Sequence, residues 1–178
     1  MLLVTPLLQE LERDFPNAKI DVFAKGVLVD IVFENYSNFG TSIKLSRKPA
    51  KDFLGYLKAW TKIVTSKYDL IINVDPGSKS GTIATKLAKS KYKVFGTAEL
   101  KAITQFSDYR HMAKYPVYAY WSYFKIPTRE ISPLQLSLST AELEKGLKTY
   151  KSLQESNKPL ICLFTYATGQ KIYDSSWW

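Results

Sequence analysis

Segments with helical periodicity alternate with short apolar segments, and this alternation constrains the fold more than any other feature. Residues 5–15 place four apolar side chains on one helical face, with Thr5 as a suitable N-cap and Pro6 at the first helical position. A strand follows at 19–24. Alternating units normally begin with a strand, and the loop after that strand often carries the chemistry. The sequence therefore predicts a fragment that lacks its first strand.

The alternation continues as far as residue 96. Gly26 separates the first strand from a helix expected at 27–34, and a second strand is expected at 41–45. A helix opened by Pro49 is expected to bury one apolar stripe, formed by Phe53, Leu54, Leu57, Trp60, Ile63 and Val64. The next helix is expected to turn Ile83, Ala84, Leu87 and Ala88 inward, before a last strand at 91–96.

The apolar run at 68–75 indicates the fold class. Its near-continuous hydrophobicity is typical of a parallel strand that is buried on both faces. Together with the alternation, it predicts an α/β fold: a Rossmann-like parallel sheet with helices on both faces. Asp75 would then lie at the carboxyl end of the most buried strand, where α/β sheets bind ligands. Asp75-Pro76-Gly77 is equally compatible with an ordinary turn.

The pattern changes after residue 98. Aromatic residues at 109–124 indicate helix on both sides of Pro116, and 126–136 is a linker with two prolines. Ser139 and Glu142 form a capping box for a helix that carries Leu143, Leu147 and Tyr150. A strand at 159–164 and a Thr/Gly/Lys loop then look like the start of a second α/β domain. The predicted domains are 1–135 and 136–178.

Composition excludes several classes of protein. The longest apolar run is shorter than the roughly 18 residues that span a bilayer, and no signal peptide is present, which fits a cytoplasmic protein. Cys162, the single cysteine, excludes an internal disulfide and reads as a buried thiol. His111, the single histidine, cannot form a histidine-based metal cluster and is expected at the surface or in helix packing.

The net charge of +9 indicates acidic partners or a solvated basic surface. Nucleic acid, a nucleotide phosphate and an anionic membrane surface all fit the charge alone. The aromatic residues cluster at 115–124 and do not alternate with basic residues, so a base-stacking RNA platform is not indicated.

Three stretches together resemble glycosyltransferase family 9, the lipopolysaccharide heptosyltransferases. The resemblance covers essentially the whole chain, and its first stretch is the most specific, a Leu-Thr-Pro-Leu helix followed by a Phe-Pro-Asn-Ala strand entry. The stretches are Leu2-Leu3-Val4-Thr5-Pro6-Leu7-Leu8 with Phe15-Pro16-Asn17-Ala18-Lys19-Ile20-Asp21-Val22, then Tyr68-Asp69-Leu70-Ile71-Ile72-Asn73-Val74-Asp75, then Ile161-Cys162-Leu163-Phe164-Thr165-Tyr166-Ala167-Thr168-Gly169-Gln170-Lys171 with Trp177.

The resemblance implies a GT-B architecture, two Rossmann-like domains that face each other across a cleft. It implies a nucleotide-sugar donor, typically ADP-heptose, the lipopolysaccharide core or another glycan as acceptor, and inversion without a metal or cofactor. Peripheral contact with the inner face of the inner membrane is expected, and nucleic acid is not. Thr165, Thr168 and Lys171 match the family's donor-phosphate loop. Thr5 and Asp75 are expected at the cleft edge.

One departure from the family affects catalysis directly. The family places a Gly-Asp pair just before the first helix, and that Asp is taken as the catalytic base. Met1 stands where the residue after the Asp would be, so no residue here inherits the role. The resemblance therefore implies that this chain is inactive alone. Three alternatives stay open: another GT-B transferase for a cell-surface glycan, a non-catalytic binding remnant, and, less well supported, a basic nucleic-acid-binding module.

Overall fold

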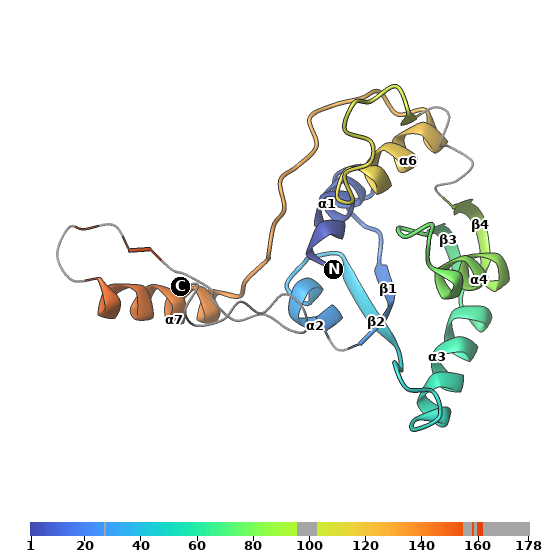
Figure 1. Ribbon diagram of the computed structural model, residues 1–178, viewed down its shortest axis with the longest axis horizontal. Helices are drawn as coiled ribbons and strands as arrows, with labels where there is room; N and C mark the ends of the chain where they lie inside the picture. Colours follow the sequence, from blue (N-terminus) through green and yellow to red (C-terminus); the bar gives the residue numbers. More distant parts are fainter. Residues whose placement is uncertain (27, 96–102, 155–157, 159, 162–178) are drawn as a thin grey trace, which may run out of the picture. The chain divides into compact units, whose positions relative to one another are not determined.

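The first helix is preceded by a turn of 3-10 helix. The computed structural model describes the chain except for residues 27, 96–102, 155–157, 159 and 162–178 (Figure 1). A 3-10 helix, η1 (Leu2–Val4), leads directly into α1 (Thr5–Asp14), with Pro6 in the first turn. Thr5 is therefore the first helical residue and Val4 occupies the N-cap, so the N-cap predicted at Thr5 is wrong. The η1 turn already places Thr5 in helical geometry, at φ −62° and ψ −32°.

The chain divides into two compact units, Met1–Ser137 and Leu138–Trp178. In the first unit, β1 (Ile20–Lys25) pairs in parallel with β2 (Phe39–Leu45), and α2 (Leu28–Phe33) connects them. β3 (Lys67–Ile72) pairs in parallel with β4 (Lys89–Val94), and α4 (Lys79–Leu87) connects them. α3 (Phe53–Thr65) joins the two pairs. Parallel strands joined by helices confirm the predicted α/β class.

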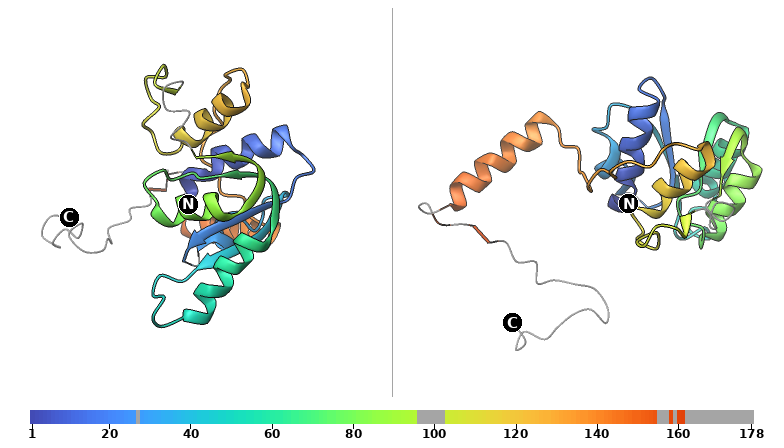
Figure 2. Two further views of the ribbon diagram at one scale, coloured as in Figure 1. Left: turned by 90° about the vertical axis from the view of Figure 1, so that its right-hand side faces the viewer. Right: turned by 90° about the horizontal axis from the view of Figure 1, so that it is seen from above.

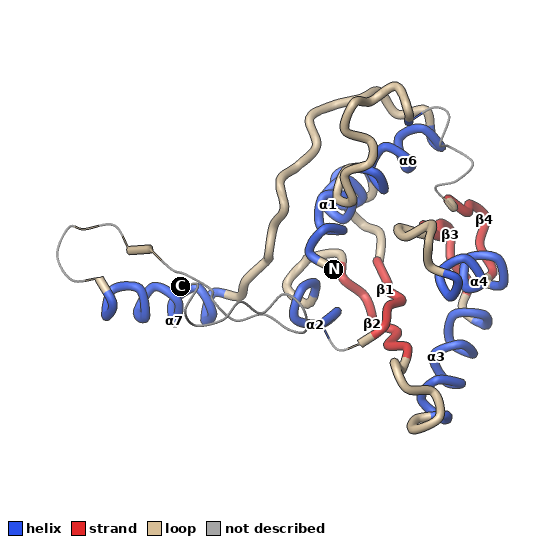
Figure 3. The backbone as a smooth tube through the Cα atoms, viewed as in Figure 1, coloured by secondary structure: helices blue, strands red, loops and turns tan. Residues whose placement is uncertain are grey.

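The two strand pairs are separate two-stranded sheets (Figure 3). Within the described residues, β1 pairs only with β2 and β3 only with β4, so one edge of β1 and one edge of β3 carry no strand partner. A side-chain contact links the two pairs, because the Tyr68 hydroxyl lies 3.4 Å from the Asp21 carboxylate. In the described part of the chain, the parallel sheet expected from the sequence is therefore divided between β1 and β3, where the missing first strand is expected.

β3 is less buried than its sequence predicts, because it has a strand neighbour on one edge alone among the described residues. Leu70, Ile71 and Ile72 are only half-buried, although their sequence predicts a strand covered on both faces. A strand reaches full burial when it has neighbours on both edges and helices on both faces. β3 has one strand neighbour, so the prediction of complete burial is wrong.

α3 and α4 bury narrower faces than the sequence predicts. α3 begins at Phe53, not at Pro49, because the Asp52 side chain caps it by accepting a hydrogen bond from the Gly55 amide at 3.0 Å. Its buried residues are Ala59 and Ile63. The rest of the expected stripes includes several exposed side chains, with exposed fractions of 64% for Phe53, 80% for Leu54, 50% for Leu57, 48% for Ile83 and 56% for Leu87. A two-stranded sheet is too narrow to cover apolar arcs this wide.

α6 (Tyr115–Phe124) holds the two largest fully buried side chains of the described residues, Trp121 and Tyr120. Pro116 lies in its first turn and does not interrupt it, and the helix does not extend back to Tyr109 as predicted. Lys125 ends the helix in the left-handed conformation, at φ 55°. α6 packs against α1 (Figures 1 and 2), and their shared cluster contains Leu7, Val117 and Trp121.

α1 contributes to two different core clusters. Leu7 belongs to the α6 cluster, in which the β3 residues Leu70 and Ile72 also pack. Leu8 belongs to a second cluster, in which Ile20 and Val22 of β1 pack. α1 therefore packs against both strand pairs, through neighbouring residues that point in different directions.

The segment after α6 is fixed to the first unit, although the sequence predicts a linker. We call residues 126–137 the strap. The Tyr36 hydroxyl donates to the Gln135 carbonyl at 2.7 Å, and Ser137 donates to the Asn35 carbonyl at 2.8 Å. Gln9 donates to the Pro133 carbonyl at 2.9 Å. The strap satisfies its polar groups against α1 and the residues after α2, so it can stay extended without forming secondary structure.

The described part of the second unit is mainly α7 (Thr140–Leu153). The predicted capping box is confirmed: Ser139 accepts from the Glu142 amide at 3.3 Å, and Glu142 accepts from the Ser139 amide at 2.8 Å. Leu160 and Ile161, the described members of the strand predicted at 159–164, lie in no strand and are exposed. Cys162 and the rest of that segment lie outside the described residues.

Candidate functional site

The donor-phosphate loop predicted from the sequence cannot be placed. Thr165, Thr168 and Lys171 all lie outside the described residues. Of the predicted site residues, the structure places Thr5 and Asp75.

Thr5 is a structural residue in this arrangement. Its side chain is fully buried, and its hydroxyl donates to the Leu2 carbonyl at 2.8 Å. The same oxygen accepts from the Gln135 amide of the strap at 3.1 Å. Both hydrogen-bonding roles of the hydroxyl are occupied, so Thr5 ties the strap to the start of α1 and presents no group to a ligand.

Asp75 lies where the sequence places it, in the loop between β3 and α4. Its side chain is exposed and accepts from the Gly77 amide at 3.0 Å, which is a turn interaction. The loop also contains Asn73, buried and accepting from the Asp75 amide at 3.3 Å, and Ser78, which caps α4 by accepting from the Gly81 amide at 3.1 Å. No contact between Thr5 and Asp75 occurs among the described hydrogen bonds and ion pairs.

The strongest polar cluster of the described chain surrounds Glu10. The Glu10 side chain is completely buried. It accepts from Arg129 Nε at 2.7 Å, from the Trp121 indole at 3.0 Å and from Arg13 at 3.0 Å. Arg129 also bonds Asp14, whose second oxygen accepts from the Tyr120 hydroxyl at 2.8 Å. We call these six side chains the Glu10 network.

The electrostatics of the Glu10 network favour fixed charges. Burial, followed by the hydrogen bond to Asp14, raises the pKa of the Tyr120 phenol well above its usual value. The Asp14 hydrogen bond raises the pKa of Arg129, so the guanidinium stays charged. A buried carboxylate with three charge-assisted partners is held in place, and the network joins α1, α6 and the strap.

An open hollow of about 450 Å³ lies beside the Glu10 network. Its lining is Arg13, Arg129, Glu130, Ile131, Ser132 and Pro133. Both arginines are already paired with carboxylates, Arg13 with Glu10 and Arg129 with Glu10 and Asp14. The hollow can admit a polar molecule, but its cations are compensated, so it is weakly attractive to an anion.

A second polar cluster lies at the start of α6. Asp108 accepts from Lys114 and, at 2.8 Å, from the Tyr118 hydroxyl, and the Lys114 hydrogen bond is the main reason that the pKa of Asp108 is lowered. Burial and the Asp108 hydrogen bond raise the pKa of Tyr118 to about 12. His111 is exposed nearby and accepts from the Ala113 amide at 3.3 Å, which confirms the expected surface position.

The sequence interpretation missed the Glu10 network. The available signal was the position of Glu10 and Asp14, which lie three and seven residues after Leu7 and therefore share its buried helical face. A carboxylate on the apolar side of a helix requires a partner. That partner, Arg129, is far away in the sequence and belongs to a segment that looked like a linker.

No cluster of three or more His, Cys, Asp or Glu side chains suited to a metal ion occurs in the described ranges. Among the described helices, none has the length and apolar character needed to cross a bilayer. The chain matches no protein-family model, no curated protein and no solved structure in these comparisons.

Proposed function

We propose that this chain is part of a nucleotide-sugar-dependent glycosyltransferase of the two-domain GT-B type. The proposed reaction transfers a heptose from ADP-heptose to the lipopolysaccharide core, with inversion and without a metal. The observation that carries the proposal is the resemblance of three separated stretches to the heptosyltransferase family. The parallel strand pairs joined by helices are compatible with the acceptor-side domain of such an enzyme.

The proposed chemistry divides the roles between a base and an anion-binding loop. A base removes the proton from an acceptor hydroxyl, whose oxygen bonds to the anomeric carbon while the bond to the nucleoside diphosphate breaks. Lys171 and the hydroxyls of Thr165 and Thr168 would stabilise the negative charge that develops on the leaving phosphate. We assign no base within this chain, because Thr5 is buried with its hydroxyl occupied and Asp75 is engaged in its own turn.

The engagement of Thr5 and Asp75 in structural hydrogen bonds favours a second candidate function. A protein that binds a nucleotide or glycan without turnover needs the phosphate loop but no base. Both candidates predict that the chain recognises a nucleoside diphosphate through Lys171, and they differ in turnover.

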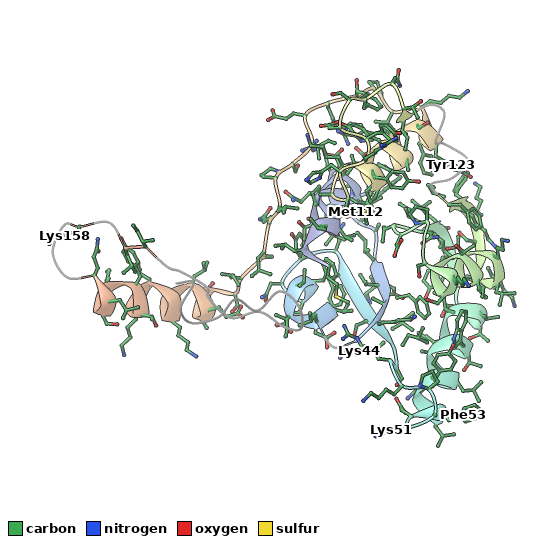
Figure 4. The ribbon with its side chains drawn as sticks, viewed as in Figure 1. Lys44, Lys51, Phe53, Met112, Tyr123 and Lys158 are labelled. Carbon is green, nitrogen blue, oxygen red and sulfur yellow. The ribbon has the colours of Figure 1, made fainter. Side chains whose placement is uncertain are left out.

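Isothermal titration of the intact chain with ADP tests the shared prediction. We expect ADP to bind, and Lys171→Ala to weaken binding by on the order of tenfold or more, because a hydrogen bond to a charged group contributes about 1.5–3 kcal/mol. Lys158→Ala is the matched control, since Lys158 is an exposed lysine of the same unit (Figure 4). Melting temperatures should be equal in all three proteins.

A transfer assay distinguishes the transferase from the binding protein, and the ADP titration can contradict both candidates. Heptose transfer from ADP-heptose, by this chain or by a longer version in which a Gly-Asp segment precedes Met1, would establish the transferase. ADP binding without transfer by either version would favour the binding protein. If ADP does not bind, or if Lys171→Ala and Lys158→Ala behave alike, the donor-loop assignment is wrong.

A further inference from the structure

α3 carries apolar side chains on two different sides. One side, with Ala59 and Ile63, packs in the core together with Trp60. On a helical projection the other side, formed by Phe53, Leu54 and Leu57, points about 80° or more away from Ala59 and Ile63. Exposures of 64%, 80% and 50% for these three residues show that the first unit leaves this second side uncovered. We call these three residues the α3 tip.

Several cations lie close to the α3 tip in sequence. Residues 47–62 include five basic residues, and all five are exposed: Arg47, Lys48, Lys51, Lys58 and Lys62. The one carboxylate between residues 47 and 62 is Asp52, which is engaged in capping α3. Figure 4 shows Lys51 and Phe53 together at the same end of α3. An aromatic ring and two leucines are therefore exposed in the first turns of α3, in a stretch of the chain that is rich in exposed cations.

We propose that the α3 tip docks onto an anionic lipid bilayer. Large apolar side chains gain free energy when they leave water for the acyl boundary, while lysines near them stay at the level of the headgroups. Each basic residue near an anionic membrane surface increases the membrane-binding constant by about fivefold, because it is attracted to the negative surface potential. The overall charge of +9 adds attraction at longer range.

The charge pattern distinguishes the α3 tip from α7. α7 also exposes leucines, with Leu143 at 56% and Leu147 at 52%. On α7, three lysines are interspersed with two glutamates, whereas residues 47–62, which include the α3 tip, contain five cations and one engaged carboxylate. An anionic surface therefore favours α3. The inference deepens the proposed function and rests on it only for the identity of the membrane, because an enzyme acting on lipopolysaccharide works at a bilayer surface.

Vesicle co-sedimentation of the intact chain tests the proposal without any nucleotide sugar. We expect binding to vesicles of phosphatidylcholine with phosphatidylglycerol, and much weaker binding to vesicles of phosphatidylcholine alone. Leu54→Ser/Leu57→Ser should weaken binding on the order of tenfold or more, because two apolar side chains no longer leave water. Lys51→Gln/Lys58→Gln should reduce it by about 25-fold and flatten its salt dependence.

Leu143→Ser/Leu147→Ser is the matched control and should bind like the unmodified chain. Equal binding to both vesicle types, or a loss in the α7 control as large as in the α3 variant, would overturn the proposal. Analytical ultracentrifugation adds a further test: oligomers that Leu54→Ser/Leu57→Ser disperses would assign the α3 tip to contact between copies instead. Circular dichroism confirms that the variants fold, and failure of vesicle binding leaves the ADP titration unaffected.

Discussion

At the scale of single residues, Glu10 is the side chain on which the first unit most depends. Glu10→Ala leaves Arg129 without one of its two carboxylates and removes the acceptor of the buried Trp121 indole. Breaking a buried ion pair from one side costs about 3–5 kcal/mol, so we expect the free energy of unfolding to fall by that amount. Urea denaturation followed by circular dichroism measures it.

The matched control for this change is Glu34→Ala, at an exposed carboxylate just after α2. We expect it to alter the free energy of unfolding by less than about 0.5 kcal/mol. If the two variants unfold at the same urea concentration, the Glu10 network contributes nothing to stability and our description of its role is wrong.

Tyr118 makes the stability of the fold depend on pH in the alkaline range. The folded protein holds this phenol neutral up to a pKa of about 12, whereas in the unfolded chain it loses its proton near pH 10. A folded pKa that is raised gives stability that is complete below the unfolded pKa and is lost as the pH rises through the folded one. The free energy of unfolding should therefore decline between about pH 10 and pH 12.

Tyr118→Phe should make that decline shallower, and at neutral pH it should cost about 1 kcal/mol for the lost hydrogen bond to Asp108. Some decline should persist, because the pKa of Tyr120 is raised as well. Tyr123→Phe, at an exposed ring, provides the comparison. Urea titrations at a series of alkaline pH values measure the slopes, and identical slopes for Tyr118→Phe and the unmodified chain would contradict the assignment.

At the scale of helices and strands, local signals predict the existence and type of the elements from α1 to β4, but not their burial. The strand–helix alternation and the Ser139 capping box depend on residues close in sequence, and the structure confirms both. The inward stripes of α3 and α4 depend on how wide a sheet lies beneath them, which periodicity does not report. Phe53, Leu54 and Leu57 were assigned to the core for that reason, and they are exposed.

The unpaired edges of β1 and β3 predict that the fold can take up another strand. We expect that a strand-forming apolar peptide fused ahead of Met1 will stabilise the chain, because α1 packs in the clusters of both strand pairs and the fused peptide would start beside them. A gain of about 1–2 kcal/mol would raise the melting temperature by roughly 3–8 °C.

A peptide of the same length with two prolines is the control, since proline cannot complete a strand ladder. Thermal unfolding followed by circular dichroism compares the two fusions. The interpretation fails if both raise the melting temperature equally, or if neither does.

At the scale of the whole molecule, the strap defines where the first unit ends. A chain that ends at Ser137 keeps Arg129, Gln135 and every strap hydrogen bond to α1. A chain that ends at Lys125 loses all of them and leaves Glu10 buried beside Trp121 without Arg129. We expect the longer chain to melt cooperatively and the shorter one to lose its cooperative transition. Similar melting curves for the two chains would show that the strap is dispensable.

The strap also shows why this level of organisation could not be predicted from the sequence. Two prolines and a lack of periodicity are the normal signature of a linker. Its structural role depends on partners about 100 to 130 residues earlier in the chain, and a single sequence contains no record of such pairings. The predicted donor loop at Thr165, Thr168 and Lys171 stays a prediction.

The contact between Glu10 and Arg129 has a consequence for biosynthesis. The two residues are 119 positions apart, and Thr5 and Gln135 are 130 apart. A ribosome adds about 5–20 residues per second, so Arg129 is synthesised roughly 6–24 seconds after Glu10. Until then the nascent chain carries a carboxylate on the face that later becomes buried, and this charge opposes premature collapse. Final closure of the unit is thereby delayed until the polypeptide that completes it has been synthesised.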